Sequence, residues 1–207
     1  AFGDWTVYGK EYVPPKGPLI VVANHLSNAD PPVVMASLNR QLYALGKQEL
    51  FKNSINSFLL RKLGVFPVNR GETSLKTLNW SSSLLREGKA ILVFPEGTRS
   101  TNAKLQQAKP GVGHIAIHSQ AAILPVGITG TETIPGLWRV ILPMSTVTAN
   151  IGQPFTLPYI EGRITRSILQ QATDIIMYRV ANLLPSSYQG YYSMSTTPNH
   201  SKSNTFQ

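Results

Sequence analysis

The feature that most constrains the fold is a regular alternation of short apolar runs with longer segments of helical periodicity. The apolar runs predict strands at residues 18–23, 41–46, 65–68, 90–94, 121–128, 140–142 and 145–151. The prolines that follow Asp30 predict a helix that begins there. Apolar residues at helical spacing predict helices at 48–63 and 72–86, and further helices are predicted at 111–119 and 163–184. Strands that alternate with helices are typical of α/β domains, so we expect one α/β domain with a mixed sheet flanked by helices.

The length of 207 residues suits a single domain, and its expected boundary lies near the end of the chain. Pro185 ends the last helical stretch, and we assign the domain to residues 1–185. The remaining segment, 186–207, is rich in Ser, Tyr, Thr and Asn. Such a polar composition predicts a poorly ordered C-terminal tail.

The composition excludes cysteine chemistry and gives no sign of a membrane-spanning segment. The chain has no cysteine, which excludes disulfides, thiolate nucleophiles and cysteine zinc sites. No stretch approaches the ~20 apolar residues that cross a bilayer, so no transmembrane helix is predicted. Because the chain begins at Ala1 and not at Met, a preceding segment that anchors the protein stays open.

The positive charge of the chain is concentrated in its middle. The formal net charge is +9, and residues 40–109 hold 12 Lys and Arg against 4 Asp and Glu. Such a field attracts phosphate head groups, acidic carrier proteins or nucleic acid; the alternative is a basic but unoccupied soluble surface. The sequence shows no zinc finger, aromatic RNP-type motif or evident recognition helix, and we expect no nucleic-acid partner.

A polar block, Asn24-His25-Leu26-Ser27-Asn28-Ala29-Asp30, follows the predicted strand 18–23. The imidazole of His25 can take a proton from a hydroxyl as that oxygen attacks a carbonyl. A carboxylate on the other ring nitrogen orients such a base, and the turn could fold Asp30 back beside His25. The alternative is that Asp30 only caps the helix before Pro31, while His25 is an ordinary loop residue.

A second polar block, Phe94-Pro95-Glu96-Gly97-Thr98-Arg99-Ser100, follows the predicted strand 90–94. Arginine binds phosphate through two hydrogen bonds, and a glycine-bearing turn exposes backbone amides to an anion. Lys104 and Lys109 follow Arg99, while Glu96 could hold Arg99 or bind a substrate hydroxyl. Arg70, just after the predicted strand 65–68, could reach the same site. The alternative for the block 94–100 is a solvated loop with ordinary charges, and the alternative for Arg70 is a surface arginine.

Two other chemistries are poorly supported. A serine hydrolase needs an activated serine, usually in a G-x-S-x-G turn, and the chain has no such motif. His114 and His118 have the spacing of a helical zinc pair, but Ile115 stands where the protease pattern requires glutamate. The sequence offers no convincing third ligand, so we expect no metal site.

Four blocks in this order, at 24–30, 64–70, 94–100 and 124–127, resemble those of the 1-acyl-glycerol-3-phosphate acyltransferases and related glycerolipid acyltransferases. The resemblance implies that His25 is the general base and Asp30 its partner. It implies that the acceptor is held by Arg70, Glu96, Gly97, Thr98, Arg99 and Lys104. The chain departs from the family pattern at Pro67 and Ala108, which leaves the acceptor open.

The same resemblance implies the reaction. A fatty acyl group would pass from acyl-CoA or acyl carrier protein to the free hydroxyl of lysophosphatidate, giving phosphatidate in phospholipid biosynthesis. No metal or prosthetic cofactor is expected. Two alternatives stay open: another acceptor, such as glycerol-3-phosphate, a lyso-amino lipid or a glycolipid, and a lipid-phosphate binding module without catalysis.

The segment 48–62 combines apolar residues with three cations, Lys52, Arg61 and Lys62. A basic amphipathic helix of this kind can lie at a membrane interface, and the segment 134–139, with Trp138, could be a second contact. We therefore expect a peripheral location on the cytoplasmic side of a membrane. The alternative is that both apolar faces pack on the sheet.

Overall fold

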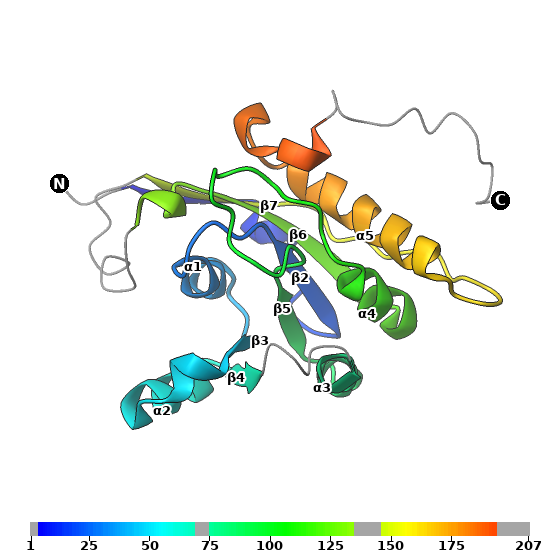
Figure 1. Ribbon diagram of the computed structural model, residues 1–207, viewed down its shortest axis with the longest axis horizontal. Coiled ribbons are helices and arrows are strands. Elements are labelled where there is room, and N and C mark those ends of the chain that lie inside the picture. Colours follow the sequence, from blue (N-terminus) through cyan, green and yellow to red (C-terminus); the bar gives the residue numbers. More distant parts are fainter. Residues whose placement is uncertain (1–3, 69–74, 135–145, 194–207) are drawn as a thin grey trace.

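The computed structural model describes residues 4–68, 75–134 and 146–193, which fold around one sheet (Figure 1). The strands are β1 Trp5–Tyr8, β2 Leu19–Ala23, β3 Leu42–Lys47, β4 Val65–Val68, β5 Ala90–Val93, β6 Ala122–Thr129 and β7 Val147–Ile151. The α-helices are α1 Asp30–Ser37, α2 Ser54–Lys62, α3 Leu75–Arg86, α4 Gly111–Ser119 and α5 Arg166–Ala181. Short 3-10 helices are η1 Lys10–Tyr12, η2 Gln48–Phe51, η3 Thr131–Thr133, η5 Ser186–Tyr188 and η6 Gly190–Tyr192.

The described strands form a seven-stranded sheet in the order β1-β7-β6-β2-β5-β3-β4. All neighbouring pairs are parallel except β6 and β7, which are antiparallel. The central strand β2 lies between β5 and β6, with Leu19 level with Ala90 on one side and with Ala122 on the other. The predicted fold class, a single α/β domain with a mixed sheet, is confirmed.

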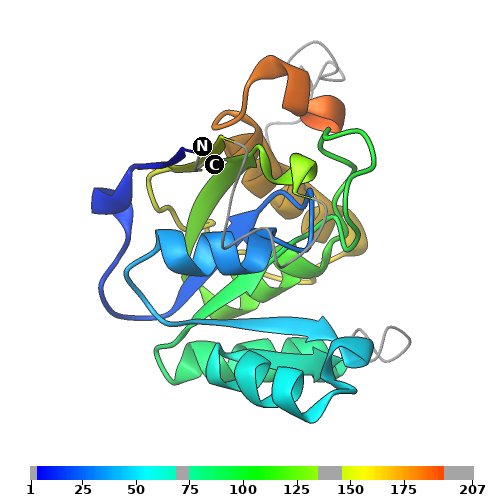
Figure 2. The same ribbon diagram turned by 90° about the vertical axis from the view of Figure 1, so that its left-hand side faces the viewer.

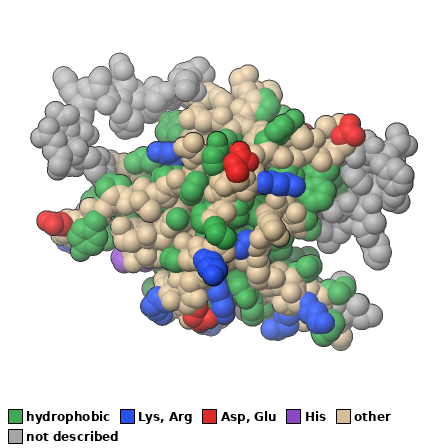
Figure 3. Space-filling view, turned by 180° about the vertical axis from the view of Figure 1, so that it is seen from behind, with side chains coloured by type: hydrophobic (Ala, Val, Ile, Leu, Met, Phe, Trp, Pro, Cys, Tyr) green, Lys and Arg blue, Asp and Glu red, His purple; other side chains and the backbone are tan. Residues whose placement is uncertain are grey.

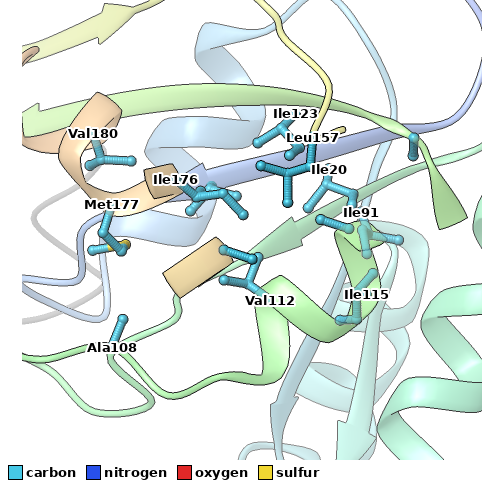
Figure 4. Close-up of a cluster of buried hydrophobic side chains, with 14 of the residues drawn as sticks. Ile20, Ile91, Ala108, Val112, Ile115, Ile123, Leu157, Ile176, Met177 and Val180 are labelled. Atoms are coloured by element: carbon cyan, nitrogen blue, oxygen red, sulfur yellow. The ribbon is translucent and has the colours of Figure 1, made fainter. Parts of the chain in front are cut away.

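Helices cover both faces of the sheet (Figures 1 and 2). Alternate residues of β2 point to opposite faces, as expected for a strand: Ile20 and Val22 pack toward α3, α4 and α5, and Val21 packs toward α1. Figure 4 shows Ile20 facing Ile91 of β5 and Ile176 of α5 within the first of these clusters. A strand buried on both faces requires a continuous apolar run, which β2 has.

Close packing brings α4 against α5. A Cβ added to Gly113 would lie 2.3 Å from the carbonyl oxygen of Leu169, so only glycine allows this approach. The amide of Gly113 donates to the Thr173 hydroxyl at 3.1 Å, which satisfies a buried amide at the start of α4. The contact fixes where α4 begins, directly after Pro110.

Several elements differ from their predicted bounds. The helix predicted at 48–63 is divided into η2 and α2, and α2 begins after Asn53, a residue type favoured at helix starts. The helix predicted at 163–184 is shorter because Thr165 caps its start, accepting from the Ile168 amide at 3.3 Å. Strand β1 was not predicted. Residues 69–74 and 135–145 lie outside the described residues, and with them the predicted strand 140–142 and Arg70.

The structure describes residues 186–193 of the segment that was predicted to be a poorly ordered tail. Residues 186–193 form η5 and η6 and pack against the domain, and the side chain of Tyr192 is only 1% exposed. The polar composition of the segment did not indicate this arrangement, which depends on the burial of one aromatic side chain, Tyr192. The rest of the segment, 194–207, lies outside the described residues.

Candidate active site

The parallel strands β2, β5 and β6 all end at the same edge of the sheet. In open α/β sheets this carboxyl edge is the usual place for a ligand. The block at 24–30 follows β2, the block at 94–100 follows β5, and η3 follows β6 shortly after its end. The topology therefore brings three segments together that are far apart in the sequence.

His25 and Asp30 form the pair that the sequence predicts. Nδ1 of His25 lies 2.7 Å from Oδ2 of Asp30, and the Asp30 side chain is fully buried. Because a carboxylate can only accept, we assign the proton of this bond to Nδ1, which leaves Nε2 of His25 as the acceptor of a substrate proton. The His25 ring is 19% exposed and stacks on Phe94, with ring centroids 4.4 Å apart.

Four donors converge on the Asp30 carboxylate. Oδ2 also accepts from the backbone amides of Leu26 at 2.6 Å and Ser27 at 2.7 Å, and Oδ1 accepts from the hydroxyl of Thr131. The carboxylate does not cap α1, in which no side chain caps the first turn. The alternative that Asp30 is only a helix cap is therefore wrong.

Glu96 ties the two polar blocks together. Its Oε1 accepts from the His25 amide and its Oε2 from the Gln106 amide, each at 2.9 Å. The Ser100 amide donates to the His25 carbonyl at 2.7 Å, so the segment 96–100 holds the backbone of His25 on both sides. Burial raises the pKa of Glu96, and the two amide bonds partly oppose that rise.

This arrangement changes the expected role of Glu96. The sequence predicted a contact between Glu96 and the acceptor or Arg99. The side chain is only 3% exposed and both of its oxygens are bonded to backbone amides, so it holds the loop and His25 instead of facing a ligand.

The remaining predicted residues of this block form an exposed, cationic loop beside His25. Gly97, Thr98, Arg99 and Lys104 are all exposed. Gly97 has φ +71°, which few other residues adopt, and a Cβ there would lie 3.1 Å from Nζ of Lys109. The Lys109 side chain therefore lies over Gly97 and adds a cation to the loop.

Some residues of the site were not predicted from the sequence. Thr131 lies 101 positions after Asp30, and no local pattern connects the two. Asn24 belongs to the first block, and its amide side chain pairs with Ile128 of β6, donating to the carbonyl at 2.9 Å and accepting from the amide at 2.7 Å. Asn24 thereby fixes the start of the loop that carries His25.

The fourth block acts through packing. A Cβ added to Gly127 of β6 would lie 2.9 Å from Cβ of Leu183, so this glycine allows the chain after α5 to approach β6 closely.

Among the described residues there is no group of three or more His, Asp or Glu side chains that could hold a metal ion. His114 and His118 stack on each other with centroids 4.0 Å apart.

The structure shows which residues of the predicted membrane surface are exposed. Among the described residues no helix has both the length and the apolar character needed to cross a bilayer. Phe58, Leu59 and Leu63 are exposed by 59%, 51% and 52%, so the alternative that this face packs on the sheet is wrong for them. Ile134 is buried in the core beside α1, and the rest of the predicted second contact, 135–139, lies outside the described residues.

Comparisons with known proteins agree with the geometry. The chain is 28% identical to the 1-acyl-sn-glycerol-3-phosphate acyltransferase of Streptococcus pneumoniae, over 82% of this chain and 59% of that protein. It is 25% identical to the enzyme of that name from Bacillus subtilis, over 87% of this chain and 88% of the relative. It spans about half of several other curated relatives.

A solved structure has the same architecture. The 1-acyl-sn-glycerophosphate (LPA) acyltransferase of Thermotoga maritima matches 87% of this chain and 72% of its own, with a TM-score of 0.67 and 26% identity. The family model described as Acyltransferase matches residues 4–129, more than half of the chain. These residues include both polar blocks that meet at the carboxyl edge of the sheet. The chain belongs to the Acyltransferase family.

Proposed function

We propose that the protein transfers a fatty acyl group from a thioester to the free hydroxyl of lysophosphatidate, giving phosphatidate. The observation that carries this proposal is the His25–Asp30 pair, which lies beside an exposed cationic loop. A base beside an anion site suits an acceptor that bears both a hydroxyl and a phosphate. The activities named for the relatives support the same reaction.

The reaction needs no covalent enzyme intermediate. Nε2 of His25 takes the hydroxyl proton as the hydroxyl oxygen attacks the thioester carbonyl. Asp30, which is hydrogen-bonded to Nδ1 of His25, orients the ring and stabilises the imidazolium that forms. When the tetrahedral intermediate collapses, the carbon–sulfur bond breaks and the thiolate receives the proton from His25. Every proton and bond in this sequence balances without a metal or prosthetic cofactor.

Arg99 and Lys104, both exposed on the loop after β5, bind the acceptor phosphate, with Arg70 as a third cation. Arg99→Ala should mainly raise the KM for lysophosphatidate, because a hydrogen bond to a charged group contributes ~1.5–3 kcal/mol. Monoacylglycerol, which lacks the phosphate, should be a poor acceptor and should lose less on mutation. Arg86→Ala is the matched control, since Arg86 is exposed at the end of α3, near the opposite edge of the sheet.

The acceptor and the donor are identified together by one set of assays. Lysophosphatidate, glycerol-3-phosphate and monoacylglycerol are each offered with acyl-CoA and with acyl carrier protein, and the products are identified by mass. Turnover of lysophosphatidate above the other acceptors supports the proposal. If another acceptor is preferred, the protein catalyses that acylation instead. If the acceptors bind but no pair of acceptor and donor gives a product, the protein is not an acyltransferase.

Both substrates are amphiphiles, and the protein meets them at a membrane through η2 and α2. Exposed apolar side chains on these elements are Leu50, Phe58 and Leu59, and Leu63 follows α2 directly. The same stretch of chain carries the exposed cations Lys52, Arg61 and Lys62. Figure 3 shows Lys and Arg side chains beside hydrophobic ones along the lower part of that view. Because η2 directly follows β3, it begins at the carboxyl edge of the sheet, where His25 lies.

Flotation with vesicles tests this surface. Each Lys or Arg near an anionic surface contributes ~1 kcal/mol, and salt screens the interaction. Binding to anionic vesicles should weaken with salt and with the triple reversal of Lys52, Arg61 and Lys62 to Glu. Reversal of Lys10, Lys16 and Arg86, three exposed cations outside η2 and α2, is the matched control. Equal loss with both triple variants contradicts a specific docking surface.

A further inference from the structure

The chain after α5 contacts two loops of the active site. Residues 186–193, here called the C-terminal segment, form the two turns η5 and η6 at the end of α5 (Figure 1, red-orange). The segment is held to the domain by Tyr192, which is 1% exposed and packs edge-on against Tyr178, with ring centroids 5.2 Å apart. The turns are therefore fixed relative to α5.

The first contact of the C-terminal segment is with the loop 104–109. The Leu105 amide donates to the Tyr188 carbonyl at 2.8 Å, and the Tyr191 amide donates to the Leu105 carbonyl at 2.9 Å. The Tyr192 hydroxyl accepts from the Ala108 amide and donates to Oδ1 of Asp174, each at 3.0 Å. The loop is thus held at Leu105 by two backbone hydrogen bonds and at Ala108 by the Tyr192 hydroxyl.

The same loop is one step from His25. The Gln106 amide, next to Leu105, donates to Glu96, whose other oxygen accepts from the His25 amide. The Lys109 amide, next to Ala108, donates to the Pro95 carbonyl at 2.9 Å. A movement of the loop 104–109 would therefore displace both Glu96 and the backbone that carries His25.

The second contact leads to Asp30. The Tyr188 hydroxyl donates to Oε1 of Glu132, and burial, with this bond, raises the pKa of Tyr188 to about 12. Glu132 follows Thr131 in the single turn η3, and Thr131 donates to Asp30. One segment thus reaches both members of the pair: His25 through the loop 104–109 and Glu96, and Asp30 through Glu132 and Thr131.

We propose that Tyr188 and Tyr192 are positioning residues, through which the C-terminal segment holds His25 and Asp30 in hydrogen-bonding register. The expected effect on turnover rests on the acyltransfer proposed above. The effect on the hydrogen bond between His25 and Asp30 does not depend on that reaction. The hydrogen-bonded proton between Nδ1 of His25 and Asp30 can be observed by NMR whatever the reaction. A segment that only adds stability would leave that proton unchanged in the folded protein.

The test removes one hydroxyl at a time and keeps each ring. Tyr192→Phe leaves the Ala108 amide and Asp174 without their shared partner, and Tyr188→Phe removes the donor to Glu132. Tyr191→Phe is the matched control, because the Tyr191 ring is 48% exposed and its backbone bond to Leu105 is retained. The downfield Nδ1 proton is assigned by its loss in His25→Ala.

We expect the Nδ1 proton resonance to shift or broaden in Tyr188→Phe and Tyr192→Phe and to stay in place in Tyr191→Phe. Turnover of lysophosphatidate, measured well below each melting temperature, should fall by about fivefold or more in the first two variants, since small misplacements of catalytic groups cost up to ~10²-fold. If Tyr192→Phe does not fold, Tyr188→Phe decides, because that residue lies near the surface.

An unchanged resonance and unchanged turnover in the folded variants would overturn the proposal, even if their melting temperatures fall. If the wild-type protein acylates no acceptor, the proposed function fails, and the resonance alone decides whether the C-terminal segment positions the pair.

Discussion

Thr131→Val tests how far the Asp30 carboxylate depends on its donors. Valine has nearly the shape of threonine and keeps its branching, so the fully buried site is neither emptied nor overfilled. The change removes only the hydroxyl that donates to Oδ1 of Asp30, while the donors to Oδ2 stay. Its effect therefore isolates one hydrogen bond to a buried charge.

A hydrogen bond to a charged group contributes ~1.5–3 kcal/mol, and the buried Oδ1 loses the donor that Thr131 provides. For a domain of this size 1 kcal/mol lowers the melting temperature by roughly 2–4 °C, so we expect a fall of about 3–12 °C. Turnover should also fall, by up to ~10²-fold, because Asp30 orients His25.

The assay is thermal unfolding followed by circular dichroism, with turnover measured on the folded protein. Thr131→Ser is the matched control: it keeps the hydroxyl and loses one methyl group, which is worth about 0.8 kcal/mol. The account requires Thr131→Val to be the more damaging of the two. If Thr131→Ser costs more, or Thr131→Val matches the wild-type protein in stability and turnover, the Thr131 hydroxyl does not support Asp30.

Two further outcomes follow from packing and burial. Gly127→Ala should lower the free energy of unfolding by ~1–3 kcal/mol, because its Cβ would lie 2.9 Å from Cβ of Leu183; Gly111→Ala, whose Cβ meets nothing within 4 Å, should be close to neutral when both variants are measured by urea titration. The raised pKa of Glu96 means that the folded protein binds its proton more tightly than the unfolded chain does. Glu96 therefore contributes stability below its unfolded pKa that is lost as the pH rises through the folded pKa. Unfolding titrations across this window should show that slope in the wild-type protein and a shallower one in Glu96→Gln; equal slopes would contradict the assignment.

The sequence was sufficient for those parts of the fold that have a local signature. The apolar runs of β2, β5 and β6 and the motif His25 to Asp30 can each be seen within a few residues. Strand β1 was missed because Trp5–Tyr8 is a short edge strand with an exposed residue at each end, which has no continuous apolar run.

The parts of the site that were missed depend on tertiary structure. Thr131 reaches Asp30 only because β6 lies next to β2, and no spacing in the sequence encodes that contact. Glu96 was expected to hold Arg99 or to bind a substrate hydroxyl. Its partners are instead backbone amides, and a sequence does not show which amides will lie near a side chain. The C-terminal segment looked disordered because its composition is polar, although Tyr192 is buried.

The central claim is that His25 is the general base, and the turnover of His25→Ala tests it most directly. Phosphatidate formed from lysophosphatidate and a thioester donor is measured by mass, with the fold checked by circular dichroism. His118→Ala, an exposed histidine on α4, is the control and should keep wild-type turnover. The account predicts that His25→Ala lowers turnover by ~10²–10⁴-fold while the fold is kept. Turnover near that of the wild type in folded His25→Ala protein would contradict it.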